Sequence, residues 1–250
     1  MKLRRGISLL PSLFTTGNIF CGFYAFIAVL DQKFYLAAWA IVIAIIFDAL
    51  DGRIARLTNT TSEFGMHYDS LADIISFGIA PAFLIYVWKL KPFGRIGWMA
   101  GFLFLLCAAL RLARFNAMPE DERSQHFIGL PTPGAAAVIA TIVIISEDGI
   151  FDSLHPFILV AFFYMLAFLM VSNVEYPAFK KLGFKRRVPF ARFLFVVLVL
   201  YIFATIPIFA LFAVSFTYAL LGPLGYLYKS AKKYWITQKE DEPLEHKEKP

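Results

Sequence analysis

Long apolar stretches alternate with short polar ones along the whole chain. The first runs from about residue 8 to 30, and seven more follow at about 34–51, 70–88, 96–115, 132–146, 154–172, 191–206 and 208–228. A helix needs about 20 apolar residues to cross the hydrocarbon core of a bilayer. The pattern therefore predicts an all-α, polytopic transmembrane bundle of about eight spans. We expect one domain over residues 1–233 and a polar tail over 234–250.

Composition and charge support this architecture and orient it. The chain is 59% hydrophobic, with a mean hydropathy of +0.67, which is more apolar than a typical soluble domain. With the N-terminus in the cytoplasm, the predicted outer loops hold only four of the 24 basic residues, namely Lys33, Lys89, Lys91 and Arg95. This asymmetry predicts a protein of the cytoplasmic (inner) membrane with both termini inside. The net charge of +6 then reflects orientation and contact with anionic lipids. No basic–aromatic module points to a nucleic-acid partner.

Four aspartates interrupt this apolar pattern, in the run DALDGRIARLTNTTSEFGMHYDSLAD. Asp48 and Asp51 are three residues apart, and Asp69 and Asp73 are four apart. Each spacing places both side chains of a pair on one face of a helix. The pairs fall at the cytoplasmic ends of the second and third spans, so we expect them to face each other. Charged groups at membrane depth are costly and usually mark a functional site.

Ligands that offer only oxygen favour hard cations such as Mg²⁺, Mn²⁺ or Ca²⁺. Four carboxylates can hold two divalent ions, the arrangement that clamps the attacking and leaving oxygens of a phosphoryl displacement. Gly52 has no side chain and lets a substrate approach the backbone closely. The Arg56 guanidinium can donate two hydrogen bonds to a phosphate. The alternative is that the aspartates are helix caps or loop ion pairs, as Asp69 could be for the third span.

The same run resembles the signature of the CDP-alcohol phosphatidyltransferases, D-x2-D-G-x2-A-R-x8-G-x3-D-x3-D, at every fixed position. The resemblance implies that Asp48 and Asp69 bridge two divalent ions, Mg²⁺ or Mn²⁺, and that Asp51 completes one of them. Asp73 would complete the other and act as the base. Contacts with the CDP-lipid would come from Gly52, Arg56 and Ser62. The resemblance also implies a homodimer.

Other stretches narrow the choice of acceptor alcohol. LLPSLFTTGNIFCGF, RLARFN and GLPTPGAAA resemble the membrane-embedded phosphatidylserine synthases of that family, which implies L-serine as the acceptor and CDP-diacylglycerol as the donor. Arg111 and Arg114 lie at i and i+3; one of them can bind a serine carboxylate, and Asn116 can orient it. Positive-inside anchoring explains the two arginines equally well, and glycerol 3-phosphate would suit the same basic groups.

We therefore expect the serine hydroxyl to attack the phosphorus next to diacylglycerol, releasing CMP. The alternatives are the same chemistry on glycerol 3-phosphate or an inositol, or an ion or proton transporter that uses the aspartates as a relay. A relay predicts a pathway across the bilayer and internal repeats, whereas these carboxylates gather at one side. A polyprenyl-group transferase fits the placement of Gly52 and Arg56 poorly. His67 is interpreted as a bystander.

Overall fold

The computed structural model describes residues 9–58, 60, 62–118, 127–147, 149, 156–176, 194, 197–198, 201 and 205–240. The predicted seventh span and residues 241–250 of the predicted tail therefore lie almost wholly outside the described residues.

The first two predicted spans form an antiparallel helical hairpin. α2 (Leu9–Leu30) and α3 (Phe34–Leu57) are joined by the turn 31–33, in which Gln32 has a φ of 61°. The backbone N–H of Lys33 donates to the carbonyl of Ala28 at 2.8 Å and closes α2. Small side chains on the shared face allow the two helices to approach closely. These buried residues are Ala25, Ala28, Ala37, Ala40 and Ala44.

The third span is one continuous apolar stretch of changing helical type. It comprises α4 (Glu63–Asp73), the π-helical η1 (Ile74–Ile79), α5 (Ala80–Ile85), the π-helical η2 (Tyr86–Leu90) and the 3₁₀ turn η3 (Lys91–Phe93). π-helical turns occur often at functional sites, and η1 begins directly after Asp73. Gly22 of α2 packs against η1 so tightly that a Cβ there would collide with Ser76.

The start of this span differs from the sequence prediction, which placed it near residue 70. α4 begins at Glu63, because the Ser62 side chain caps it by accepting a hydrogen bond from the N–H of Gly65 at 3.0 Å. Asp69 is therefore an interior residue of the helix, and the alternative that it caps the third span is wrong.

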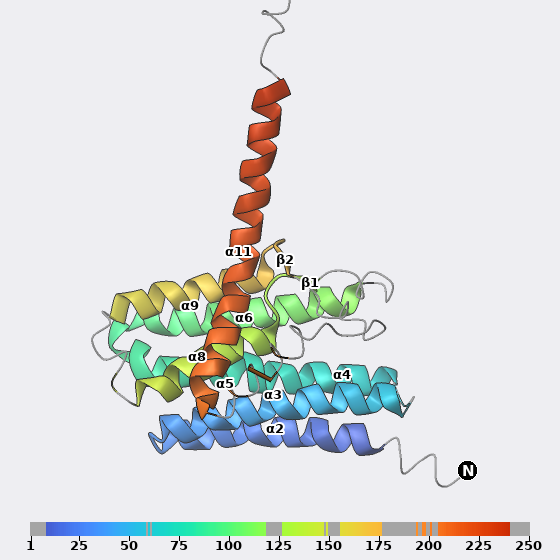
Figure 1. Ribbon diagram of the computed structural model, residues 1–250. Helices are drawn as coiled ribbons and strands as arrows, with labels where there is room; N and C mark the ends of the chain where they lie inside the picture. Colours follow the sequence, from blue (N-terminus) through green and yellow to red (C-terminus); the bar gives the residue numbers. More distant parts are fainter. Residues whose placement is uncertain are drawn as a thin grey trace, which may run out of the picture.

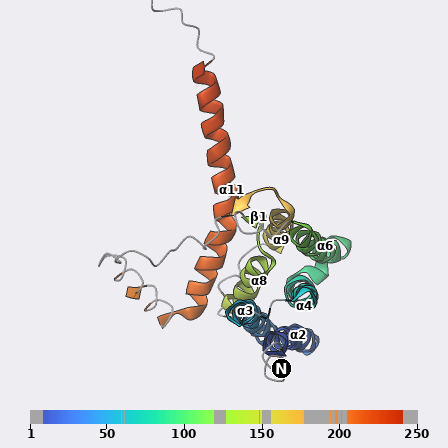
Figure 2. The same cartoon turned by 90° about the vertical axis from the view of Figure 1, so that its right-hand side faces the viewer.

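The middle of the chain completes the bundle. α6 (Arg95–Ala117), α8 (Thr132–Ser146) and α9 (Pro156–Val171) follow, and a two-residue antiparallel pairing joins β1 (Phe127–Ile128) to β2 (Glu175–Tyr176). α8 is the central helix, since every residue from Ala135 to Ser146 is buried. Figure 2 shows the bundle helices nearly end-on, with α8 between α3 and α9.

The last helix, α11 (Pro207–Glu240), lies across the bundle instead of alongside it (Figures 1 and 2). Tyr176 of β2 anchors it. Pro223 has no N–H, so the carbonyl of Ala219, four residues earlier, lacks its helical partner. The Tyr176 hydroxyl donates to that carbonyl at 3.1 Å, and its ring fills the space above Gly222. Burial and the neighbouring Tyr218 raise the pKa of Tyr176 to about 12, so its hydroxyl keeps the donated proton at neutral pH.

The structure confirms an all-α membrane fold. Among the described residues, five helices are long and apolar enough to cross a bilayer, and the shorter α8 and α9 are apolar as well. Together they account for seven of the eight predicted spans. α11 also runs past residue 233, where we placed the end of the domain, so the domain boundary stays a prediction.

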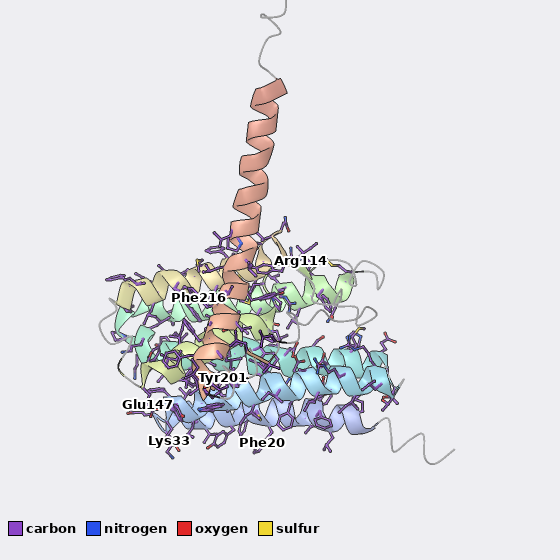
Figure 3. All side chains as sticks on the ribbon, viewed as in Figure 1. Phe20, Lys33, Arg114, Glu147, Tyr201 and Phe216 are labelled. Carbon is purple, nitrogen blue, oxygen red and sulfur yellow. The ribbon has the colours of Figure 1, made fainter. Side chains whose placement is uncertain are left out.

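The loops that we expected on the outer side meet at one end of the bundle. Lys33, Trp88 and Glu147 line one shallow hollow of about 340 Å³ there. Figure 3 labels Lys33 and Glu147 at this end and Arg114 towards the other. The helices thus alternate in direction as the charge pattern predicts, while the side of the membrane that each end faces stays a prediction.

Candidate active site

The two aspartate pairs meet where α3 ends and α4 begins. One carboxylate oxygen from each of Asp48, Asp51 and Asp69 lies within 4.8 Å of the corresponding oxygens of the other two. α3 ends at Leu57 and α4 begins at Glu63, and the two pairs lie at one level although Asp51 and Asp69 are 18 residues apart in sequence. The prediction that they face each other is confirmed for these three side chains.

Asp73 lies one helical turn beyond Asp69 and is almost fully buried. It lines the same cavity as Asp48 and Asp69, although it does not belong to the tight group of three. Its Oδ1, like the Oδ1 of Asp69, is buried without a hydrogen-bond partner among the described residues. Buried carboxylate oxygens are normally satisfied, so both oxygens are open to a cation or a donor that the chain does not supply.

Asp51 is held by α2. The hydroxyl of Thr15 donates to Asp51 Oδ2 at 2.9 Å, and both side chains are buried. Thr15 was not predicted as a site residue. It lies in the stretch LLPSLFTTGNIFCGF, whose resemblance to the synthases was the only signal in the sequence, because no local pattern connects it to a carboxylate 36 residues away.

A cavity of about 1000 Å³ opens beside the carboxylates. Its walls come from α3, α4, α6, α8 and α11 and are mostly apolar. Its charged residues, Asp48, Asp69, Asp73 and Arg111, come from α3, α4 and α6, together with the polar Ser70 and Asn116, while α11 adds the uncharged Ser215, Thr217 and Tyr218. The cavity therefore has the shape and polarity to hold a molecule with one charged and one apolar part.

Arg111 lines this cavity and is almost fully buried, with a relative exposure of 8%. Its Nη1 donates to the hydroxyl of Thr132, at the N-terminus of α8, at 3.0 Å, while its Nε has no partner among the described residues. It interacts electrostatically with Asp73 and Asp48. A buried guanidinium with a free N–H is suited to binding an anion.

The other two predicted acceptor contacts have different surroundings. Asn116 lines the cavity, and its Nδ2 donates to the hydroxyl of Ser70 at 2.9 Å. Arg114 binds the C-terminal end of α9 instead: its Nη2 donates to the carbonyl of Val171 at 3.1 Å, and its Nη1 donates to Asn173 at 3.0 Å. A cation at a helix C-terminus satisfies free carbonyls, so the structure gives Arg114 a contact that stabilises the fold, and its role towards the acceptor stays a prediction.

The predicted CDP-lipid contacts lie at the exposed edge of the site. Arg56 is exposed, and its Nε donates to the carbonyl of Gly52, one turn earlier, at 2.8 Å. The space above Gly52 is open, with only the end of the Arg56 side chain near it. Ser62 is occupied as the cap of α4. His67 is exposed, its Nε2 lies 4.0 Å from Glu63 Oε1, and it is not among the residues that line the cavity. Its interpretation as a bystander stays a prediction.

The donor set suits a divalent cation. Three carboxylates converge, two carboxylate oxygens are unsatisfied, and neither sulfur nor imidazole belongs to the group. Hard oxygen ligands of this kind favour Mg²⁺, Mn²⁺ or Ca²⁺ over zinc.

A sequence profile of the CDP-alcohol phosphatidyltransferases matches residues 8–171, which hold all four aspartates and Arg111. The chain belongs to the CDP-alcohol phosphatidyltransferase family. The enzyme class and the fold expected from the signature are thereby confirmed. The match ends at the last residue of α9 and does not include α11.

Among individual members of the family, the chain is similar to a CDP-diacylglycerol–serine O-phosphatidyltransferase of Helicobacter pylori. The two are 37% identical over 225 residues, which cover 90% of this chain and 93% of the relative. An enzyme of the same name from Bacillus subtilis is 33% identical over 70% of this chain and 93% of its own length. An archaetidylserine synthase of Methanothermobacter thermautotrophicus is 36% identical over 70% of this chain and 72% of its own length.

Proposed function

We propose that this transferase moves the phosphatidyl group of CDP-diacylglycerol to the hydroxyl of L-serine. The serine oxygen forms the new bond to the phosphorus next to diacylglycerol, the bond from that phosphorus to the CMP oxygen breaks, and CMP leaves. The observation that carries the proposal is the carboxylate cluster beside a mostly apolar cavity that also contains a buried arginine. The similarity to enzymes named CDP-diacylglycerol–serine O-phosphatidyltransferase supports serine as the acceptor.

In this proposal the carboxylates hold two divalent ions, Mg²⁺ or Mn²⁺. By family resemblance, Asp48 and Asp69 would each hold both ions, and Asp51 and Asp73 would each hold one. Such ions, when bound, stabilise the charge on the attacking and leaving oxygens. The Thr15 hydroxyl holds Asp51 in place through its 2.9 Å bond. At the exposed edge, Gly52, Arg56 and Ser62 contact the diphosphate side of the donor lipid.

Asp73 accepts the proton of the serine hydroxyl. Its unpartnered Oδ1 and its position in the cavity support this role, and a base must be within hydrogen-bond reach of the proton that it takes. Arg111 binds the serine carboxylate through the N–H groups that Thr132 does not occupy, and Asn116 orients the amino acid from α6.

The cavity places the lipid part of the substrate. Leu211, Val214 and Leu221 of α11 face Ala137 of α8 across it and offer an apolar wall to the acyl chains. The nucleotide then stays at the polar end, which the charge asymmetry of the sequence assigns to the cytoplasmic side of the inner membrane. The homodimer is part of this proposal on family resemblance alone.

The test is CMP release by purified protein in detergent or vesicles that contain CDP-diacylglycerol. Serine, glycerol 3-phosphate, inositol and ethanolamine are supplied in parallel, with Mn²⁺, with Mg²⁺ or with excess chelator. We expect the fastest release with serine and much slower release with the other alcohols, abolished by the chelator and restored by either ion. A preference for glycerol 3-phosphate or inositol would refute serine as the acceptor and leave the family chemistry intact. Full turnover in excess chelator would refute the metal mechanism.

A further inference from the structure

Asn18 of α2 is a fully buried polar side chain near the carboxylates that the proposed mechanism leaves without a role. Its exposed fraction is 0%, and both Nδ2 and Oδ1 lack a hydrogen-bond partner among the described residues. Buried amide groups are almost always paired, because leaving them unpaired is costly. Because both polar atoms of this carboxamide are unpaired, we expect it to gain a hydrogen-bond partner when the enzyme has bound its ions.

The geometry of the α2–α3 hairpin places Asn18 at the same depth along the helices as Asp48. Thr15 of α2 bonds to Asp51 of α3 at 2.9 Å. The helices are antiparallel, so three residues forward along α2 and three residues back along α3 lead to the same next level, about 4.5 Å deeper. Those residues are Asn18 and Asp48. Each lies on the same helix face as the member of the bonded pair before it.

The third span confirms this depth from the other side. The hydroxyl of Ser76, in η1, donates to the backbone carbonyl of Asn18 at 2.9 Å, and Ser76 lies three residues beyond Asp73. Asn18 is therefore enclosed between α3 and η1, next to the turn that holds Asp73.

The chemistry of the carboxamide fits this place. Its NH₂ group offers two donors, and a carboxylate is purely an acceptor. Carboxylates that bind metals are usually themselves hydrogen-bonded, which fixes their orientation. Thr15 supplies such a donor to Asp51, whereas no described residue supplies one to Asp48.

We propose that Asn18 is a positioning residue of the metal centre. Its carboxamide makes no hydrogen bond to Asp48 in this structure; when the ion is bound it donates one to that carboxylate and fixes the orientation in which Asp48 holds the ion. The inference rests on the proposed metal site and adds a residue that the family signature does not contain. Asn18 acts through Asp48 and touches neither the substrate nor the reacting atoms.

The test compares Mn²⁺ binding by purified wild type, Asn18→Leu and Asn18→Ala, without substrate, by the electron paramagnetic resonance of free Mn²⁺. Leucine has about the size of asparagine and brings no polar atom. We expect the dissociation constant for Mn²⁺ to rise about 10- to 100-fold in both variants. The melting temperature of chelated Asn18→Leu should equal or exceed that of chelated wild type, since an unpaired buried amide is removed.

Thr141→Val is the matched control. Thr141 is a buried polar residue of α8, and its hydroxyl bonds to the Ala137 carbonyl of its own helix at 2.7 Å, so its removal should leave Mn²⁺ affinity unchanged. In CMP-release assays, the Mn²⁺ concentration for half-maximal rate should rise in the Asn18 variants, while kcat at saturating Mn²⁺ changes far less. Wild-type Mn²⁺ affinity in folded Asn18→Leu or Asn18→Ala would overturn this inference alone. A wild-type protein that binds no Mn²⁺ would overturn the proposed metal site along with it.

Discussion

Replacing Arg111 by methionine tests the proposed acceptor site most directly. The side chain is 92% buried, one N–H is bonded to Thr132, and Nε is free, so the guanidinium can bind a carboxylate in the cavity. Methionine keeps the length of the side chain and removes its charge and donors. A hydrogen bond to a charged group contributes about 1.5–3 kcal/mol, which corresponds to about a 10- to 150-fold loss in kcat/KM for serine.

The informative comparison is with ethanolamine, which carries the amine and the hydroxyl of serine without the carboxylate. If Arg111 binds the carboxylate, the preference of the wild type for serine over ethanolamine should shrink in Arg111→Met by the same factor. Mn²⁺ binding by the variant shows whether the neighbouring carboxylates still hold the ion once the charge beside Asp73 and Asp48 is lost.

Arg114→Met is the matched control, because it removes the same charge one turn along α6. It should lower the melting temperature through the lost bonds to the end of α9 and leave the preference between serine and ethanolamine unchanged. An unchanged preference in folded Arg111→Met would refute the assignment. If Arg114→Met instead loses the preference for serine over ethanolamine, then the carboxylate of the acceptor binds Arg114.

Three further outcomes are expected. Asp73→Asn should lower kcat about 10²- to 10⁴-fold, as for a lost general base, while a binding assay still detects CDP-diacylglycerol; near-normal turnover would show that another group takes the proton. Thr15→Val should weaken Mn²⁺ binding about 10- to 100-fold, because Asp51 loses its buried donor. Thr16→Val, which changes the exposed neighbouring threonine, should leave Mn²⁺ affinity unchanged. Equal Mn²⁺ affinities of wild type and Thr15→Val would contradict the role given to the bond from Thr15 to Asp51. Tyr176→Phe should destabilise the docking of α11 by about 1–3 kcal/mol, since a buried carbonyl loses its donor. Hydrogen exchange that rises in α11 and stays constant in α2 and α3 would show this, and unchanged exchange in α11 would argue against the anchor.

Much of the site was predictable from local pattern. The spacing of Asp48, Asp51, Asp69 and Asp73 determines which face of a helix each occupies, and two helix ends joined by a short connection must meet. The apolar stretches likewise predicted the helices, since crossing a bilayer requires about 20 apolar residues in helical form. These features depend on residues close together in sequence, and so they are visible without coordinates.

Contacts between distant residues were decided only by the tertiary structure. Arg111 and Arg114 are equivalent in sequence, three residues apart on one helix, yet one faces the cavity and the other binds the end of α9. The bond from Thr15 to Asp51 depends on how α2 and α3 pack, which no spacing within either helix specifies.

The same distinction explains the parts of the fold that differed from expectation. Hydropathy predicts that a helix is apolar and long enough to cross a membrane but does not predict its direction. α11 lies across the bundle, where it packs on α8 and where Tyr176, far away in sequence, bonds to the carbonyl that Pro223 leaves free. The sequence alone therefore predicted the carboxylates and arginines of the candidate site, because their spacing is local, and the packing of the helices decided which of these side chains meet.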